Sequence, residues 1–256
     1  MELATQSVVA EEALSDFLPS MPKHYARLFE HTEMLEHLRI VNERGQRTVH
    51  LGFCREGALP GIALCIVMDT RTGLLSLVGD VLLGQDLDVT MTHAFTRHTG
   101  SRQESLICVW ARRITVSTLP TNVGQEDLRD ISFALTELIE KQQAWDHTEQ
   151  LRKSAIVLAP VAPRVYYDTQ AMRSGEFVLV VQAPDCPGLL LAVTRALFRQ
   201  GAEIVASEAR TENGLAKDRF TLACGSRGTF TPDRLADIQQ GTLSAIRRLI
   251  AQRIER

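Results

Sequence analysis

The fold is decided by a stretch that occurs twice: FVLVVQAPDCPGLLLAVTRAL at residues 177–197 and IALCIVMDTRTGLLSLVGDVL at residues 62–82. An offset of 115 residues aligns the two copies without a gap and places Gly73 against Gly188. In each copy an apolar run, typical of a buried strand, precedes the glycine. Apolar residues then recur at positions i, i+1, i+4 and i+8, which puts one stripe on a helix. Each stretch therefore predicts a strand, a glycine turn and a helix.

Both copies continue with the same further elements, two strand-like segments and a second apolar stripe at helical spacing. They span residues 88–96, 104–112 and 128–139 in the first copy, and 203–211, 217–224 and 235–250 in the second. Asn213-Gly214, between the later two strands, is a strong hairpin signal. The predicted order in each copy is β-α-β-β-α, the core of the ferredoxin-like arrangement.

A further strand is expected ahead of each copy. The usual unit has its fourth strand after the second helix, but in the second copy that helix reaches the last residues of the chain. Residues 48–53 and 164–167 are the candidates, so we expect each domain to begin with its edge strand. The predicted fold class is α+β: two ferredoxin-like βαββα(β) domains, with antiparallel sheets, helices on one face and a short helical segment in front. The predicted bounds are 1–45 for the helical lead-in, 46–145 for the first domain, 146–161 for a linker and 162–256 for the second domain.

The composition is that of a globular protein and argues against several classes of partner. The 256 residues are enough for two domains, and 45% are hydrophobic and 23% charged. The net charge of −3 and the aromatic content of 5% argue against nucleic acid or an anionic membrane surface as partners. No apolar run approaches the ~18 residues of a membrane span. The acidic N-terminal segment lacks the basic region of a signal peptide, so we expect a cytoplasmic location.

The cysteines and histidines show no metal-ligand pattern in the sequence. The five cysteines form no C-x-x-C pair, which favours reduced thiols buried as small hydrophobes. The seven histidines are scattered without the spacing of metal ligands. The sequence therefore predicts neither a metal site nor a cofactor.

Residues 162–168, the apolar run 178–181 and the turn 183–190 together resemble a known family. They are similar to the second ACT domain of the protein-PII uridylyltransferase/uridylyl-removing enzyme family, which has an apolar strand and an Asp-x-Pro-Gly-Leu-Leu turn before a helix. Residues 17–38 resemble the helical lead-in to that family's first ACT domain. The resemblance runs from about Phe17 to the end of the chain and concerns the regulatory tail alone. It implies two ACT domains that sense an amino acid such as glutamine.

The second copy's turn has the chemistry that an amino-acid ligand needs. Gly188 permits a close backbone approach and Pro187 fixes the entry angle. The amides that follow, at Leu189 and Leu190, lie at a helix N-terminus, which favours a carboxylate. Asp185 is placed to receive an ammonium group. The resemblance implies that the opposite wall is the start of the partner domain's second strand, which is Ala202-Glu203-Ile204 or Leu87-Asp88-Val89.

A purely structural interpretation of this turn stays open, because Asp-x-Pro-Gly before a helix is also good turn chemistry. The first copy departs from the pattern: Thr72 precedes Gly73 in place of proline, and Asp69 lies one position upstream of the aligned aspartate. We expect this copy to act as a structural partner. The alternative is a different ligand, contacted through Arg71.

Catalytic motifs of the enzyme family are not recognisable in the sequence. Nucleotidyl transfer of that type uses a Gly-Ser turn followed by an Asp-x-Asp magnesium pair, whereas Gly100-Ser101 here follows Asp86-Leu87-Asp88. The repeat places Asp86 at a helix-to-strand turn, and no His-Asp dipeptide suggests an HD phosphohydrolase. We therefore expect no enzyme activity.

Three hypotheses for the function remain. The first is an amino-acid-sensing regulator whose two domains contact each other. The second is an uridylyltransferase-like enzyme or subunit. The third is an assembly module without a ligand, which would bind a protein partner or form a homo-oligomer.

Overall fold

The computed structural model describes residues 11–54, 62–100, 102–114, 124–141, 160–171, 176–224 and 229–254. The lead-in comprises helical residues 11–17, the 3-10 turns Leu18–Ser20 and Tyr25–Arg27, and helix α2 (His31–Arg44). The first copy contains β1 (Val49–Phe53), β2 (Ile62–Asp69), α3 (Leu74–Gly84), β3 (Leu87–Thr99), β4 (Arg102–Arg113) and α4 (Gln125–Lys141). The second copy contains β5 (Arg164–Tyr167), β6 (Glu176–Pro184), α5 (Leu189–Arg199), β7 (Ala202–Glu212), β8 (Leu215–Cys224) and α6 (Pro232–Ile254). The α+β class is confirmed, and the predicted linker 146–161 lies outside the described residues except for residues 160 and 161.

Both copies begin with their edge strand, as predicted. β1 pairs antiparallel with β2, and β5 pairs antiparallel with β6. In each copy the next strand inward is the one that enters the second helix, β4 or β8, so the copies share one internal order. The strand that the usual ferredoxin-like unit places last therefore comes first in this chain.

The two copies share one sheet. β3 and β7 pair antiparallel, which joins the halves into eight strands in the order β1-β2-β4-β3-β7-β8-β6-β5. His93 lies directly opposite Glu208, and these residues are equivalent positions of the 115-residue repeat. Irregular pairing occurs at equivalent places as well, within 89–91 and 204–206. A pseudo-two-fold axis therefore passes through the β3–β7 junction, and the sheets expected from the sequence are continuous.

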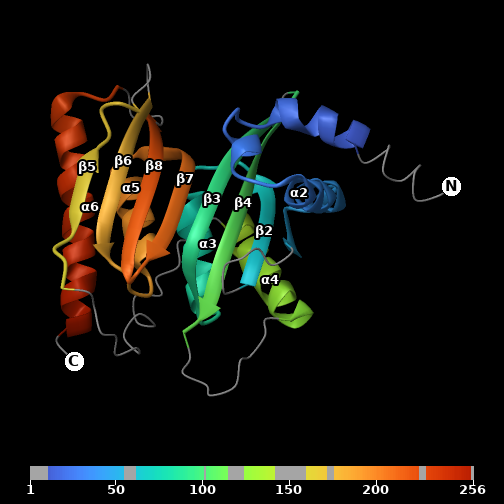
Figure 1. Ribbon diagram of the computed structural model, residues 1–256. Coiled ribbons are helices and arrows are strands. Elements are labelled where there is room, and N and C mark those ends of the chain that lie inside the picture. Colours follow the sequence, from blue (N-terminus) through green and yellow to red (C-terminus); the bar gives the residue numbers. More distant parts are fainter. Residues whose placement is uncertain are drawn as a thin grey trace.

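The helices of both copies cover the same face of this sheet (Figure 1). α3 and α5 pack against each other across the junction, and their equivalent residues Asp80 and Arg195 form an ion pair with 2.9 Å between Oδ1 and Nη2. Beneath the helices, two apolar cores are built from the inward-facing residues of each copy. The repeat is thus held together by a strand pair and a helix pair.

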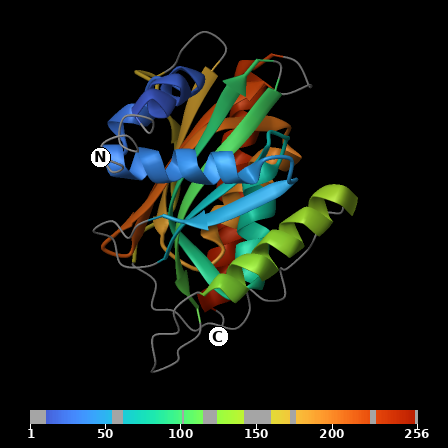
Figure 2. The ribbon, with the colours of Figure 1, turned by 90° about the vertical axis from the view of Figure 1, so that its right-hand side faces the viewer.

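The lead-in covers the opposite face of the first half of the sheet. Figure 2 faces the β1 edge and shows the blue lead-in helices on one side of the sheet and α4 on the other. Alternate residues of β2 and β4 point to the two faces, so Leu64 joins the core under the helices while Ala63 and Cys65 join the core under the lead-in. This third core, which we call the lead-in core, also contains Tyr25 and Phe95.

Candidate functional site

Two equivalent places bring the glycine turn of one copy against the other copy. Gly73 and Gly188 both have left-handed backbone, with φ of +80° and +83°, immediately before α3 and α5. The start of β7 faces the Gly73 turn, and the start of β3 faces the Gly188 turn. Glu203 and Asp88 are the equivalent acidic residues at these strand starts. Each turn therefore faces the strand start that the resemblance implies, with a hydrogen bond between Asp88 and the Gly188 turn and a shared cleft at the Gly73 turn.

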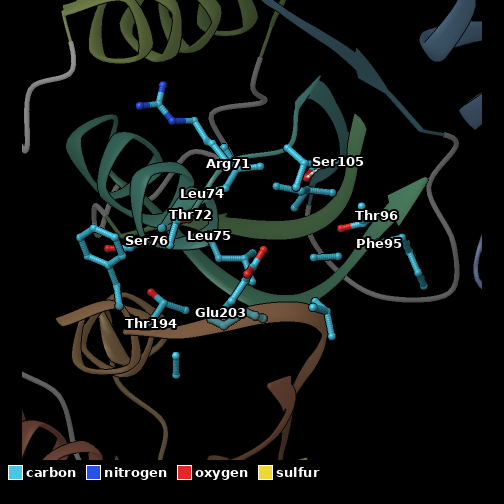
Figure 3. Close-up of a pocket in the computed structure, with 18 residues that line it drawn as sticks. Arg71, Thr72, Leu74, Leu75, Ser76, Phe95, Thr96, Ser105, Thr194 and Glu203 are labelled. Carbon is cyan, nitrogen blue, oxygen red and sulfur yellow. Dashed lines mark hydrogen bonds between the residues drawn. The ribbon is translucent and has the colours of Figure 1, made fainter. Parts of the chain in front are cut away.

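The first of these places is an open cleft, which we call the Gly73 cleft. Its free volume is about 30 Å³, roughly what a water molecule occupies, so a larger ligand would have to move the walls apart. Its walls come from the Gly73 turn, α3, β3 and β4 of the first copy and from α5 and β7 of the second. The polar side chains that line it are those of Thr70, Arg71, Thr72, Ser76, Thr96, Ser105, Thr194 and Glu203 (Figure 3).

The Gly73 cleft combines hydrogen-bond donors with a carboxylate. Leu77 donates its amide to the Gly73 carbonyl at 3.0 Å and begins the helical ladder of α3, so the amides of residues 74–76 precede that ladder. Glu203 reaches up from β7 toward Leu75 on α3, while Arg71 points away from the cleft (Figure 3). The cleft therefore combines the start of α3, where the helix dipole favours an anion, with the Glu203 carboxylate, which favours a cation.

An aromatic ring from the second copy closes one end of this cleft. A Cβ atom added at Gly73 would lie 2.9 Å from Cδ2 of Phe198 on α5. The close approach explains why the turn needs glycine, in addition to its left-handed backbone. Figure 3 shows the wall formed by α5 beside the turn.

The Gly188 turn is filled by side chains of the protein itself. Asp88 accepts a hydrogen bond from the Gly188 amide at 3.4 Å and another from Arg112 at 2.9 Å. Arg112 also donates to Asp185 at 3.1 Å, so the residue predicted to receive a ligand's ammonium receives a guanidinium instead. Burial and the charge of Asp185 raise the pKa of Asp88 to about 6.

A third carboxyl group lies near this turn. Asp218 on β8 is buried, and burial together with the charge of Asp185 raises its pKa to about 8. The raised pKa favours the protonated form of Asp218, which avoids a further negative charge beside Asp185. The second turn is thus a closed polar contact between the copies.

The other predicted ligand-binding residues divide between the two turns. Thr72 and Gly73 line the Gly73 cleft together with Ala202, Glu203 and Ile204. The remaining members are buried or partly buried around the Gly188 turn and its facing strand: Leu87, Val89, Pro187, Leu189 and Leu190. The open space therefore lies at the turn for which the sequence favoured a structural role.

The Asp-x-Asp pattern of Asp86 and Asp88 is explained by the turn between α3 and β3. Asp86 has a left-handed φ of +56° there, as its predicted place at a helix-to-strand turn requires. Asp88, two residues later, contacts the Gly188 turn of the other copy. The two aspartates thus belong to a turn and to a contact between copies.

A cluster of potential metal ligands was missed by the sequence reasoning. One ligand atom each from His37, Cys65 and Cys108 lies within 4.8 Å of the others, and all three residues are buried. They come from α2, β2 and β4, so no spacing along the chain indicates them. The signal that could have found the pair of cysteines is the sheet order, because Cys65 and Cys108 face each other once β2 lies beside β4.

No family model matches this chain, and a search of curated proteins finds no match. In the described part of the chain, no helix has both the length and the apolar character needed to cross a membrane.

Proposed function

We propose that this chain is a non-catalytic regulatory protein with two ACT-type domains, and that an amino acid binds in the Gly73 cleft. The repeated order of elements and the sheet shared between the copies support the ACT assignment, as does the turn at residues 183–190. The observation that carries the proposal is the position of Glu203. It belongs to the second copy and lines the same cleft as the first turn of α3 in the first copy.

Each charged end of an amino acid has a partner in this cleft. The α-carboxylate would bind the amides of residues 74–76, where the helix dipole also favours negative charge. The α-ammonium group would pair with the Glu203 carboxylate on the opposite wall. The hydroxyl groups of Thr70 and Ser105, 3.0 Å apart, add polar groups for a ligand side chain. Glutamine, which the resemblance implies, is therefore the first ligand to test.

The Gly188 turn is proposed to hold the copies together rather than to bind the ligand. A ligand there would have to displace the Asp88 carboxylate, which already accepts the Gly188 amide and the Arg112 guanidinium. Asp88 is buried whereas Arg112 is half-exposed, so displacement would leave the buried carboxylate without its partners, which is unfavourable. The proposed site therefore moves from the second turn to the first.

A ligand in the Gly73 cleft would touch both copies and so stabilise one arrangement of the junction. The contacts that would respond are the β3–β7 strand pair and the Asp80–Arg195 ion pair between α3 and α5. Coupling between sites in such systems is typically ~1–3 kcal/mol. The proposed output is a change in self-association or in binding of a separate target protein.

Calorimetry with the common amino acids tests the proposal on three proteins: the wild type, Glu203→Gln and Glu212→Gln. Glu212 lies on the same strand but is exposed and pairs with Lys217, so its variant makes the same charge change outside the cleft. We expect the wild type and Glu212→Gln to bind at least one amino acid equally well. Glu203→Gln removes the charge from the ligand's hydrogen-bond partner, and such a charged hydrogen bond contributes about 1.5–3 kcal/mol. We therefore expect this variant to bind the amino acid about 10- to 100-fold more weakly. A flat response of the wild type to every amino acid would contradict the proposal.

The non-catalytic part of the proposal has its own test. The wild-type protein is incubated with UTP, magnesium and PII protein, and labelled PII is measured. We expect none, and time-dependent labelling would support the enzyme hypothesis instead.

A further inference from the structure

The lead-in core contains a cluster of sulfur and nitrogen ligands that the proposed function does not use. Cys65 on β2 and Cys108 on β4 are a directly opposed cross-strand pair on the face that the lead-in covers. Directly opposed side chains have Cβ atoms about 4.5–5.5 Å apart, so both thiols can reach one point above the sheet. Both residues are essentially inaccessible to solvent.

The lead-in helix supplies an imidazole to the same point. His37 on α2 is 1% exposed, and its Nε2 atom lies 3.3 Å from Sγ of Cys108. One ligand atom each of His37, Cys65 and Cys108 lies within 4.8 Å of the other two. The three side chains therefore converge from a helix and two strands.

A further thiol, that of Cys54, lies just after the end of β1. Cys54 is partly buried and close enough to Cys65 and His37 to interact with both, but it lies outside the group of ligand atoms that are within 4.8 Å of one another. It would complete a set of three thiols and one imidazole from four different elements. Its partial exposure also gives a metal ion a route of entry.

The surroundings of His37 are those of a metal-bound histidine. Its Nδ1 atom lies 2.8 Å from the hydroxyl group of the buried Tyr25. A ligating imidazole normally donates its second N–H to an acceptor that fixes the ring, and a tyrosine oxygen can accept that bond. The Phe29 ring packs edge-on against His37 with 4.7 Å between centroids, which keeps water away from the ring.

We propose that His37, Cys65 and Cys108 bind one Zn²⁺ ion, and that Cys54 moves toward them to complete a tetrahedral Cys₃His site. Zinc–sulfur and zinc–nitrogen bonds of about 2.3 and 2.0–2.1 Å place tetrahedral ligands roughly 3.5–3.8 Å apart. The ligand atoms of His37, Cys65 and Cys108 already lie within 4.8 Å of one another. Thiolate and imidazole ligands suit zinc, whereas calcium and magnesium prefer oxygen. On binding, each thiol loses its proton to solvent, so Zn²⁺ replaces three protons and the centre carries one net negative charge.

The zinc ion would fasten the lead-in to the first half of the sheet. His37 lies on the lead-in helix, whereas the three cysteines lie on or at the end of β1, β2 and β4. Apart from the metal, this contact is held by the apolar core around Tyr25 and Phe29 and by the buried ion pair between Arg44 on α2 and Glu104 on β4. Removal of zinc should therefore loosen α2 without disturbing the β3–β7 junction.

Metal analysis of the full-length wild-type protein, produced in zinc-supplemented medium, tests the proposal. We expect close to one zinc ion per chain after dialysis. Replacement by Co²⁺ should give the thiolate-to-cobalt charge-transfer band and the intense visible bands of a four-coordinate tetrahedral site. Zinc well below stoichiometry together with no such cobalt spectrum would overturn the proposal, as would a disulfide between Cys65 and Cys108 in freshly purified protein.

Variants identify the ligands. Cys108→Ala and His37→Gln should lose the zinc, and Cys54→Ser, at the rim, tests the fourth ligand where misfolding is least expected. Cys224→Ser is the matched control because Cys224 lies on β8, outside the cluster, and it should keep full stoichiometry. Retention of zinc and of the tetrahedral cobalt spectrum by Cys54→Ser would overturn the four-ligand site. Equal losses in Cys224→Ser and Cys108→Ala would show that the zinc is bound non-specifically and would overturn it as well.

Discussion

One added methyl group tests the turn on which the Gly73 cleft depends. In Gly73→Ala the new Cβ atom would lie 2.9, 3.0 and 3.4 Å from three carbons of the Phe198 ring, at a φ of +80°. Left-handed backbone costs a non-glycine residue about 1–2 kcal/mol. The ring, which is 46% exposed, must also move and lose part of its burial, at roughly 1 kcal/mol. We therefore expect Gly73→Ala to lower the free energy of unfolding by about 2–3 kcal/mol in total.

Urea unfolding of the wild type and two variants measures this loss. Gly100→Ala is the matched control, because Gly100 also has a positive φ, +60°, but an added Cβ atom would meet nothing within 4 Å. Gly100→Ala should lower the free energy of unfolding only by the cost of a left-handed backbone, about 1–2 kcal/mol. The difference between the variants, about 1 kcal/mol, reports the contact with Phe198. Equal losses would refute the close packing of α5 on the Gly73 turn.

Two further substitutions probe buried charges. The pKa of Asp218 is raised from 3.8 to about 8 in the folded protein, so its protonation stabilises the fold below pH 4 and this contribution is lost as the pH rises to 8. Asp218→Asn should therefore melt above the wild type at pH 8 and close to it near pH 4; a pH-independent difference would contradict this. Arg44→Ala should lower the free energy of unfolding by about 3–5 kcal/mol, because Arg44 is 1% exposed and pairs with Glu104. Urea unfolding measures this loss. Arg39→Ala is the control, because it removes an exposed ion pair and should lower the free energy of unfolding by only ~0–1 kcal/mol. Equal losses in the Arg44 and Arg39 variants would contradict the buried role of Arg44.

The repeat is enough to predict the local structure of the chain. Apolar periodicity around Gly73 and Gly188 predicts the strands and helices, because burial of one face dictates those patterns. The edge strands could also be placed, since 48–53 and 164–167 are the apolar segments ahead of each copy. These features depend on neighbours in the sequence.

Contacts between the copies could be predicted only in part. The ACT resemblance predicts that Asp88 faces the Gly188 turn. It does not predict that Arg112 pairs with Asp88. The guanidinium reaches both aspartates only because β4 lies beside β3 in a particular register. That register depends on strand pairing at long range, which periodicity does not encode.

The cluster around His37 was beyond sequence reasoning for the same reason. Its residues lie on α2, β2 and β4, and no two of them are near each other in the chain. The apolar alternation that buries Cys65 and Cys108 looks the same whether the residues serve packing or bind a metal. Only the seating of α2 on the sheet brings the imidazole to the thiols.

Hydrogen–deuterium exchange with and without a bound amino acid decides whether the two copies bind a ligand jointly. The amides of residues 74–76 precede the helical ladder of α3 and should exchange rapidly in the free protein. Ligand binding should slow exchange there and, in the same titration, across residues 202–205 at the start of β7. Protection confined to one copy, or found at the Gly188 turn instead, would contradict a shared Gly73 cleft.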